Sequence, residues 1–307
     1  MTQHDSDADL FEAQRPRLLR LAYRMLGSMT EAEDIVQEAW LRWSRVDSTE
    51  VREPAAYLNR TVTRLCLDAM KSARARRETY FGSWLPEPIL EPEDEDMRFD
   101  ELTLTLMLTL ERLSPLERAA FLLHDVFDVP LDEIAATLDR EPSAVRQLAV
   151  RARRHVQQDR PRFKVAREDG ARIAQAFFQA STSGDLDGLR AMLAHDVVIR
   201  SDGGGKVLAF RNPIIGIDRI LRMVAGLYRK HVSQSAVFIQ PVRIDGLPGY
   251  VSRERGDVLQ TTAFEIQGGV ITTIYITRNP DKLAQIAELM EEDAEVEDAS
   301  GAPSKHH

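Results

Sequence analysis

One face of an expected helix between residues 142 and 156 carries side chains that could read double-stranded DNA. Arginine and glutamine can hydrogen-bond to base edges in the major groove, and additional arginines neutralise phosphates. The other face is apolar at helical spacing, so it can pack inward. The outward residues are Arg146, Gln147, Val150, Arg151, Arg153 and Arg154. A solvated basic face on an ordinary helical bundle would leave the same pattern, so DNA binding is a hypothesis at this point.

The elements around this helix predict a helix-turn-helix. Residues 130–138 form a short helical pattern, residues 139–141 turn the chain, and Pro142 leads into the basic helix. Two short helices joined by a tight turn, with the second one basic, are typical of this motif. Further upstream, residues 114–117 place Ser, Pro and Glu where a helix start prefers them.

The N-terminal part, residues 10–80, predicts three helices. The first runs from about Leu10 to Leu26, a capping-box pattern at Thr30 and Glu33 starts the second, and Pro54 opens the third. The third helix has an apolar stripe and an opposite, polar face. That polar face carries Arg60, Arg64, Asp68 and Lys71.

The second of these helices also has two distinct faces. Its outward face carries Asp34, Gln37 and Glu38, whereas the other face is apolar at helical spacing. For Trp43 we favour a place in the core. For Trp40, core packing and a surface role remain equally open.

The charge is distributed unevenly along the chain. The net charge is −9, which by itself argues against nucleic-acid binding. However, residues 52–77 hold seven basic against two acidic residues, and residues 143–164 hold seven against one. Acidic residues gather instead in residues 91–96 and 288–298. Two basic helices therefore lie in a chain that is acidic between and after them.

Composition restricts the class of protein further. A chain of 307 residues with 43 % hydrophobic residues has room for two or three domains. No apolar run approaches the roughly 20 residues of a membrane span, and the acidic N-terminus is no secretory signal. Cys66 is the only cysteine, so an internal disulfide and a cysteine-rich zinc site are excluded, and we expect it to be buried in a helix. These features predict a cytoplasmic protein.

The pattern changes after about Pro161 and predicts an α+β domain, with a curved sheet that holds helices on one side. Gly268 and Gly269 supply a hairpin turn. The expected helices are Asp169–Ala180, a short one after Gly184, Ile214–Lys230 and Asp281–Met290. The expected strands are one ending near Arg200, then Lys206–Phe210, Ala236–Ile244, Gly249–Arg253, Val258–Ile266 and Val270–Ile276.

Three segments resemble the extracytoplasmic-function sigma factors. The segments Glu31–Trp43 (EAEDIVQEAWLRW) and Ala55–Glu78 (AAYLNRTVTRLCLDAMKSARARRE) are similar to the domain that binds polymerase and recognises the −10 element. The segment Leu131–Val156 (LDEIAATLDREPSAVRQLAVRARRHV) is similar to the domain that recognises the −35 element. The resemblance covers about residues 10–160, and the order of the two patterns makes it specific. It implies core RNA polymerase, through its β′ clamp and β subunits, and promoter DNA as partners.

The resemblance also implies roles for individual residues. It assigns polymerase binding to Asp34, Gln37, Glu38 and Trp40, and −10 recognition to Arg60, Arg64, Asp68 and Lys71. It assigns −35 recognition to Arg146, Gln147, Val150, Arg151, Arg153 and Arg154. Arg64 stands where some relatives carry a polar amide, so the base preference does not follow from the resemblance.

The C-terminal part, about residues 168–290, resembles the SnoaL-like domains, which fold as an α+β cone. Sigma factors with such a fused domain form a subgroup, and WLPEP (Trp84–Pro88), DGGGK (Asp202–Lys206) and NPDKL (Asn279–Leu283) match it. Taken alone, three glycines in DGGGK predict a tight hairpin between strands. Within the subgroup, these motifs are implied to place a regulatory domain against the DNA- and polymerase-binding domains. The implied regulatory residues are Trp84, Leu85, Pro86, Asp202, Gly203, Gly204, Gly205, Lys206, Asn279, Pro280, Asp281 and Lys282.

Related folds also include enzymes that use a buried carboxylate as a general base. The titratable candidates are Asp202, Asp245, Asp257, Tyr228, Tyr275, His195 and His231. Nothing in their spacing marks a catalytic group, so we predict no enzyme, no cofactor and no metal. A small apolar ligand in the cone stays open as a further partner.

The expected fold class is multidomain, with two all-α sigma domains, the second containing the helix-turn-helix, and a C-terminal α+β SnoaL-like cone. The expected boundaries are 10–80, a linker at 81–100, 101–160, 168–290 and an acidic tail at 291–307. Trp84 and Leu85 are unusual in a linker, so we expect them to dock on another part of the chain. Two alternatives remain: a helix-turn-helix repressor with a ligand-binding domain, and a SnoaL-like cyclase or isomerase.

Overall fold

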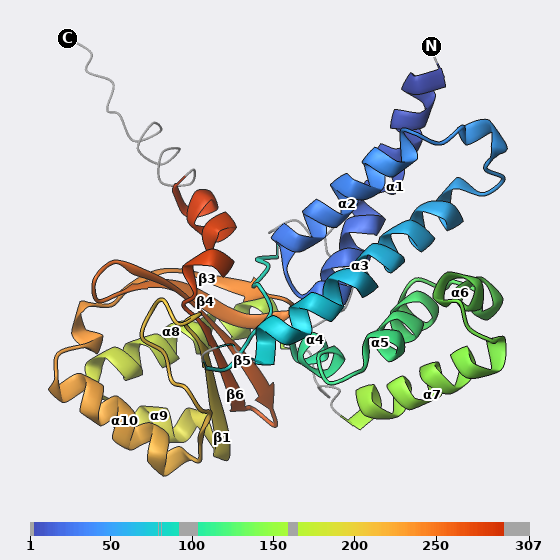
Figure 1. Ribbon diagram of the computed structural model, residues 1–307. Helices are drawn as coiled ribbons and strands as arrows, with labels where there is room; N and C mark the ends of the chain where they lie inside the picture. Colours follow the sequence, from blue (N-terminus) through green and yellow to red (C-terminus); the bar gives the residue numbers. More distant parts are fainter. Residues whose placement is uncertain (1–2, 79, 81, 92–103, 159–164, 292–307) are drawn as a thin grey trace, which may run out of the picture. The chain divides into compact units, whose positions relative to one another are not determined.

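A computed structural model describes residues 3–78, 80, 82–91, 104–158 and 165–291 (Figure 1). These residues fall into two compact units. The N-terminal unit contains the described parts of Met1–Thr79 and Leu102–Arg160, and the C-terminal unit contains those of Tyr80–Glu101 and Pro161–His307. Tyr80 and the described linker residues 82–91 therefore fold with the C-terminal unit, although they precede half of the N-terminal unit in sequence. The predicted acidic tail lies outside the described residues, except for Glu291.

The N-terminal unit begins with the three predicted helices. Trp43 is 1 % exposed and its indole N–H donates to the Asp7 carbonyl, which confirms its place in the core. The second helix begins earlier than expected, because Gly27 ends the first helix at a positive φ and Ser28, rather than Thr30, accepts the Glu31 N–H as N-cap. The helices are α1 (Gln3–Leu26), α2 (Met29–Trp43) and α3 (Pro54–Glu78), with the short helix η1 (Ser48–Glu50) before α3.

The second half of this unit contains the predicted helix-turn-helix. Ser114 and Glu117 form a complete capping box at the start of α5. Asp139 ends α6 in the left-handed conformation (φ 53°), which turns the chain toward the basic helix α7. The elements are α4 (Leu104–Leu110), α5 (Pro115–Phe121), η3 (Leu122–Val126), α6 (Leu131–Leu138) and α7 (Pro142–Gln158).

The C-terminal unit is the predicted α+β cone. One six-stranded sheet has the order β2-β1-β6-β5-β4-β3, and all neighbours are antiparallel except β1 and β6. Its helices are α8 (Arg167–Ser183), α9 (Leu186–Met192) and α10 (Ile217–Arg229), with short helices η4 (Ser233–Ser235) and η5 (Pro280–Lys282). Its strands are β1 (Leu193–Asp202), β2 (Ile214–Ile215), β3 (Val237–Ile244), β4 (Leu247–Glu254), β5 (Val258–Gln267) and β6 (Val270–Thr277).

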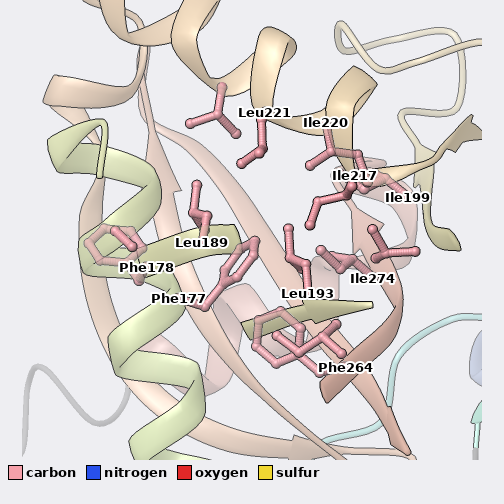
Figure 2. Close-up of a cluster of buried hydrophobic side chains, with 14 of the residues drawn as sticks. Phe177, Phe178, Leu189, Leu193, Ile199, Ile217, Ile220, Leu221, Phe264 and Ile274 are labelled. Carbon is pink, nitrogen blue, oxygen red and sulfur yellow. The ribbon is translucent and has the colours of Figure 1, made fainter. Parts of the chain in front are cut away.

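The main core lies between the helices and the concave face of this sheet (Figure 2). Phe177 packs edge-on against Phe264, with ring centroids 4.9 Å apart. Leu189 and Ile220 contribute from α9 and α10. Aliphatic and aromatic side chains thus fill the centre of the cone.

A second apolar cluster covers the opposite face of the sheet. Val251 contacts Leu283 and Ile286 there, and Leu90 of the linker packs against the same group. Residues 284–291 are helical, so the expected last helix begins a few residues later than predicted, after η5. The linker and the last helix therefore share one face, opposite the main core.

Two predictions about the DGGGK region are wrong. Residues 206–210 form no strand, because Gly203 accepts the N–H groups of both Lys206 and Val207 and turns the chain out of the sheet. Ile214 and Ile215 instead pair with β1, which delays the start of α10 to Ile217. DGGGK is consequently a turn that ends β1 and begins the long connection to β2, and not a tight hairpin.

None of the described helices is both long and apolar enough to cross a bilayer. Cys66 is fully buried within α3 as expected, and burial raises the pKa of its thiol.

Candidate functional site

The outer face of α7 presents the predicted DNA-reading side chains. Arg146, Gln147 and Arg154 are exposed, and Val150 is 51 % exposed between them. The opposite side of the helix is buried and consists of Val145, Leu148, Ala149, Ala152 and Val156. An exposed row with both amide and guanidinium donors suits contacts in a major groove.

Two of the predicted α7 residues form ion pairs that hold the helix in place. The Arg151 Nε donates to Glu117 Oε1 at 2.7 Å, and the Arg153 Nε donates to Asp125 Oδ1 at 2.5 Å. Partial burial alone would raise the pKa of Glu117, but the hydrogen bonds from Arg151 and Ser114 lower it. Both ion pairs tie α7 to the segment 114–126 that precedes the helix-turn-helix.

The predicted −10 residues share one face of α3 but have different surroundings. Arg60 is half-buried, and its Nε has no hydrogen-bond partner among the described residues. Arg64 is exposed and donates to the carbonyls of Thr137 and Ala136, at 3.1 and 3.3 Å, at the end of α6. The face also has an exposed ion pair, formed by Asp68 and Lys71 at 2.8 Å.

The predicted polymerase-binding residues lie on the outer face of α2. Asp34 and Gln37 are exposed, whereas Glu38 pairs with Arg42 at 2.9 Å. Trp40 is half-buried and packs at a tilt against Phe11, with ring centroids 5.1 Å apart. Trp40 therefore combines partial core packing with a surface edge.

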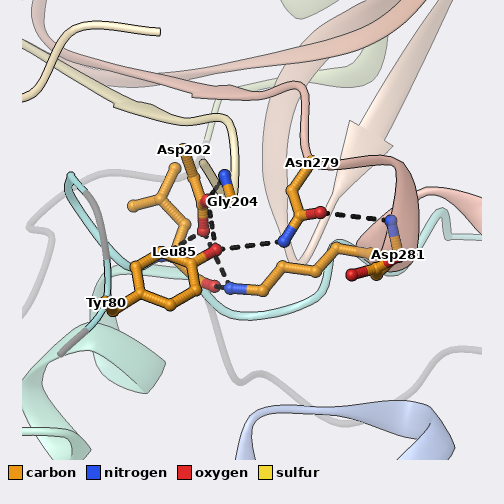
Figure 3. A network of polar contacts seen from close by, with 7 residues as sticks. Tyr80, Leu85, Asp202, Gly204, Asn279 and Asp281 are labelled. Atoms are coloured by element: carbon orange, nitrogen blue, oxygen red, sulfur yellow. Dashed lines mark hydrogen bonds and ion pairs between the residues drawn. The ribbon is translucent and has the colours of Figure 1, made fainter. Parts of the chain in front are cut away.

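A polar network in the C-terminal unit unites WLPEP, DGGGK and NPDKL around Asp202 (Figure 3). The Asp202 side chain is fully buried and accepts four hydrogen bonds. Its Oδ1 accepts from the Tyr80 hydroxyl at 2.6 Å and from the Gly204 N–H at 3.0 Å. Its Oδ2 accepts from the Leu85 N–H at 2.9 Å and from Lys282 Nζ at 2.8 Å. All three motifs are held at one carboxylate.

Lys282 supplies the positive charge of this network. Its ammonium group also donates to the Leu85 carbonyl, and it lies 4.3 Å from the centroid of the Trp84 ring and 5.2 Å from that of Tyr80. An ammonium over aromatic faces gains a cation–π attraction in addition to its ion pair. Leu85 itself is 1 % exposed, which confirms that Trp84 and Leu85 dock.

Asn279 closes the network from the NPDKL side. Its amide Nδ2 donates to the Tyr80 hydroxyl at 3.0 Å, and its Oδ1 accepts the Asp281 N–H at 3.1 Å. Burial, followed by the hydrogen bond to Asp202, raises the pKa of Tyr80. At the surface, Lys206 and Asp281 form an exposed ion pair at 2.6 Å.

The linker continues along the sheet beyond this network. Leu90 forms an antiparallel bridge with Ile244, and the Glu91 N–H donates to the Arg243 carbonyl at 3.0 Å. Arg243 also pairs with the Glu91 carboxylate at 3.0 Å. The linker thus extends the edge of the sheet at β3.

We expect Gly204→Ala to loosen this network. Gly204 has φ +63°, and a Cβ there would lie 2.5 Å from the Asn279 amide. Left-handed strain and this clash together should cost about 1–3 kcal/mol of unfolding free energy, measured by urea denaturation. Gly256→Ala is the matched control, because Gly256 has φ +83° but its Cβ would meet nothing within 4 Å. Equal losses in the two variants would show that the contact with Asn279 contributes nothing.

Two contributing residues were not among the sequence predictions. Tyr80 lies shortly before WLPEP in the sequence. The sequence signal that could have identified it was an aromatic residue beside a linker expected to dock. Arg118 in α5 is 1 % exposed and donates to the carbonyls of Met25 and Leu110, at 2.7 and 2.9 Å, and to Glu111 at 2.6 Å. It joins the C-terminal ends of α1 and α4, where carbonyl groups lack helical partners.

The remaining titratable candidates do not form a site inside the cone. Asp245 and Asp257 occupy left-handed turn positions, and His195 is exposed. The Tyr275 hydroxyl donates to Glu265 at 3.2 Å, and burial raises its pKa. Both residues alternate with core positions of β6 and β5, so this pair faces away from the main core. The exposed Tyr228 and His231 lie near the end of α10.

Comparison with known proteins identifies the two helical halves. Residues 10–76 match Sigma-70 region 2, and residues 103–156 match Sigma-70, region 4. The first match contains the predicted faces of α2 and α3, and the second contains α7.

Two relatives match over most of the length of both chains. The chain is 38 % identical to the ECF RNA polymerase sigma factor SigJ of Mycobacterium tuberculosis, over 89 % of this chain and 91 % of that protein. It is 34 % identical to the probable ECF RNA polymerase sigma factor SigI of the same species, over 92 % and 97 %. The crystal structure of M. tuberculosis SigJ is similar with a TM-score of 0.71 and 33 % identity, covering 90 % of this chain and 98 % of that one.

Proposed function

The chain belongs to the extracytoplasmic-function RNA polymerase sigma factors, and from this premise we propose which of its residues bind core RNA polymerase and promoter DNA. A sigma factor directs polymerase to specific promoters and is not an enzyme. The SnoaL-like cone is therefore a fused domain of a transcription initiation factor. Since such a factor acts where polymerase is, we place it in the cytoplasm.

The observation that carries the DNA assignment is the exposed face of α7 within the region 4 match. Arg146, Gln147 and Val150 form its centre, and Arg154 extends it. We assign −35 recognition to these side chains. Arg151 and Arg153 support the helix through their ion pairs and reach DNA only if they exchange those partners.

Region 2 supplies the other two surfaces. The exposed Asp34 and Gln37, with Glu38 and the edge of Trp40, would bind the polymerase clamp. The face of Arg60, Arg64, Asp68 and Lys71 would contact the −10 element, where cations suit the backbone of a melted strand. The contacts of Arg64 with Thr137 and Ala136 would have to be exchanged for DNA.

We further propose that the Asp202 network controls how the cone acts on the sigma regions. The linker is the covalent connection between region 2 and region 4, and Tyr80 and residues 82–91 are held on the cone by Asp202, Lys282 and the β3 edge. A linker that is held on the cone restricts how region 2 and region 4 can be arranged on promoter DNA. A released linker would let the two regions move independently of each other.

We expect Arg146→Ala to weaken promoter binding by the holoenzyme about 5- to 150-fold. This range corresponds to about 1–3 kcal/mol for a lost bidentate base contact. The measurement is an equilibrium gel shift with core RNA polymerase and a promoter duplex, repeated with substituted −35 bases. The variant should also lose discrimination at one base position.

Arg15→Ala is the control, because Arg15 lies on α1 in an exposed ion pair with Glu12. If Arg146→Ala bound and discriminated like wild type, the −35 assignment would be wrong. If the unaltered chain bound the duplex tightly without polymerase, the repressor alternative would replace the sigma assignment for this surface.

A further inference from the structure

A second group of cations lies in the C-terminal unit. Between Lys206 and Lys230 the sequence has six basic residues and one acidic residue, Asp218. Four of the basic residues gather on and just after α10, namely Arg219, Arg222, Arg229 and Lys230. In a chain of net charge −9, such a cluster is as unusual as the one on α7.

The α10 cations are exposed and lack acidic partners within the described part of the chain. Several other surface cations there have a carboxylate within 4 Å, for example Lys206 with Asp281 and Arg253 with Asp257. Asp218, the acidic residue of α10, pairs with Arg190 of α9. Arg219, Arg222 and Lys230 form no ion pair with any described residue, and Arg229 donates only to its own helix at Ala225.

These residues share one face of α10. Positions 219, 222, 226 and 229 follow the spacing of a helix face, and the opposite side is buried through Ile217, Ile220, Leu221 and Val224. The row from Arg219 to Arg229 spans about 15 Å along the helix axis. Figure 1 shows α10 next to α9 on the helical side of the cone.

Gly226 leaves a gap in the middle of this row. A Cβ there would meet nothing within 4 Å, and its φ is not positive, so neither packing nor backbone conformation requires glycine. Glycine inside a helix costs about 1 kcal/mol relative to alanine. It exposes the helix backbone between Arg222 and Arg229, where a phosphate could approach closely.

We propose that the α10 basic row, Arg219, Arg222, Arg229 and Lys230, binds the phosphate backbone of duplex promoter DNA. The inference rests on the proposed function, which brings such a duplex to the chain. A line of unpaired guanidinium groups suits successive phosphates, and phosphate contacts need no base recognition. A protein partner is less well suited, because Tyr228 is the one exposed large hydrophobic side chain on this helix, at 37 %.

The test is the salt dependence of promoter binding by the holoenzyme of the full chain. The variant is Arg219→Gln with Arg222→Gln and Arg229→Gln, and the duplex extends upstream of the −35 element. Each lost phosphate contact makes the negative slope of log K against log salt shallower by about 0.9, so the magnitude of the slope should fall by about 2–3. Affinity at low salt should fall about tenfold or more, without a change in base discrimination.

The matched control removes the same charge elsewhere on the unit, through Arg172→Gln, Arg253→Gln and Arg255→Gln. A second pair of variants uses the gap: Gly226→Glu should weaken binding, and Gly226→Ala should not. Thermal melting checks that all variants fold.

The outcomes separate the two proposals. If the unaltered holoenzyme showed no promoter-dependent binding, the proposed function would fail first. If it bound, but the α10 variant had the slope of the control variant, the DNA contact would be refuted. A loss of affinity for core polymerase with an unchanged slope would also overturn the proposal, since the row would then bind protein.

Discussion

Replacing Asp202 with alanine should detach the linker from the C-terminal unit and lower the unit's free energy of unfolding by about 3–5 kcal/mol. The substitution leaves the Lys282 ammonium, whose side chain is only 11 % exposed, without its counter-ion. It also removes the acceptor of the Tyr80 hydroxyl and of the Leu85 N–H. Each buried donor left unpaired adds to the loss.

Two measurements check this expectation. Urea denaturation gives the free energy, and limited proteolysis within residues 80–91 reports release of the linker. Asp218→Ala is the control, because its side chain is 71 % exposed in an ion pair with Arg190, so its loss should stay within about 1 kcal/mol. Unchanged proteolysis in Asp202→Ala would show that the linker is held by something other than this network.

A double-mutant cycle then isolates the ion pair. Lys282→Met removes the buried ammonium but keeps apolar contact with the Trp84 ring. Because each single variant removes the opposite charge from a buried ion pair, the double variant should lose less unfolding free energy than the sum of the two single variants. If the losses of unfolding free energy were additive, Asp202 would stabilise the unit mainly through its hydrogen bonds with Tyr80 and Leu85.

Arg118→Met should destabilise the N-terminal unit by a similar amount, about 3–5 kcal/mol. The substitution leaves the carbonyls of Met25 and Leu110 without this donor, and removes the Arg118 guanidinium from Glu111, which is 14 % exposed. Arg118→Lys should recover only part of the loss, since an ammonium lacks the planar fork that reaches several acceptors. Native-state hydrogen exchange of α1 and α5 measures the effect.

The control is Arg15→Met, which removes an exposed arginine from α1. The expected pattern is lower protection in both α1 and α5 for Arg118→Met, because Arg118 joins the two matched regions. A loss of hydrogen-exchange protection confined to α5 would indicate that the hydrogen bond to the Met25 carbonyl contributes little. The two regions would then be held together by other contacts, such as those of Arg17 with Phe127.

The sequence alone determined the helical organisation and the family. Ser114, Pro115 and Glu117 specify a helix start through local chemistry, and the structure contains the complete capping box. The apolar period of residues 142–156 specifies which face of α7 is exposed, because a helix fixes the direction of each side chain from its spacing. Such features depend on residues within a turn or two of one another.

The tertiary structure alone decided the course of the chain at DGGGK. Three glycines allow a hairpin or a turn that leaves the sheet equally well. The choice depends on β1 pairing with Ile214 and Ile215, and on Asn279 packing against Gly204. Neither partner is a sequence neighbour, so local rules predicted a strand at 206–210 that does not exist.

Burial of charge is the other property that only the tertiary structure decided. Asp202 lies 117 residues from Leu85 and 80 from Lys282, and Arg118 lies 93 from Met25. From sequence, Asp202 was one regulatory candidate among twelve and Arg118 was not distinguished from a surface arginine. A charged side chain is buried only when distant parts of the chain together supply its partners, because desolvation is otherwise too costly. The sequence identifies the motifs, but only the packing of distant segments shows that Asp202 connects them and that Arg118 joins α1 to α4.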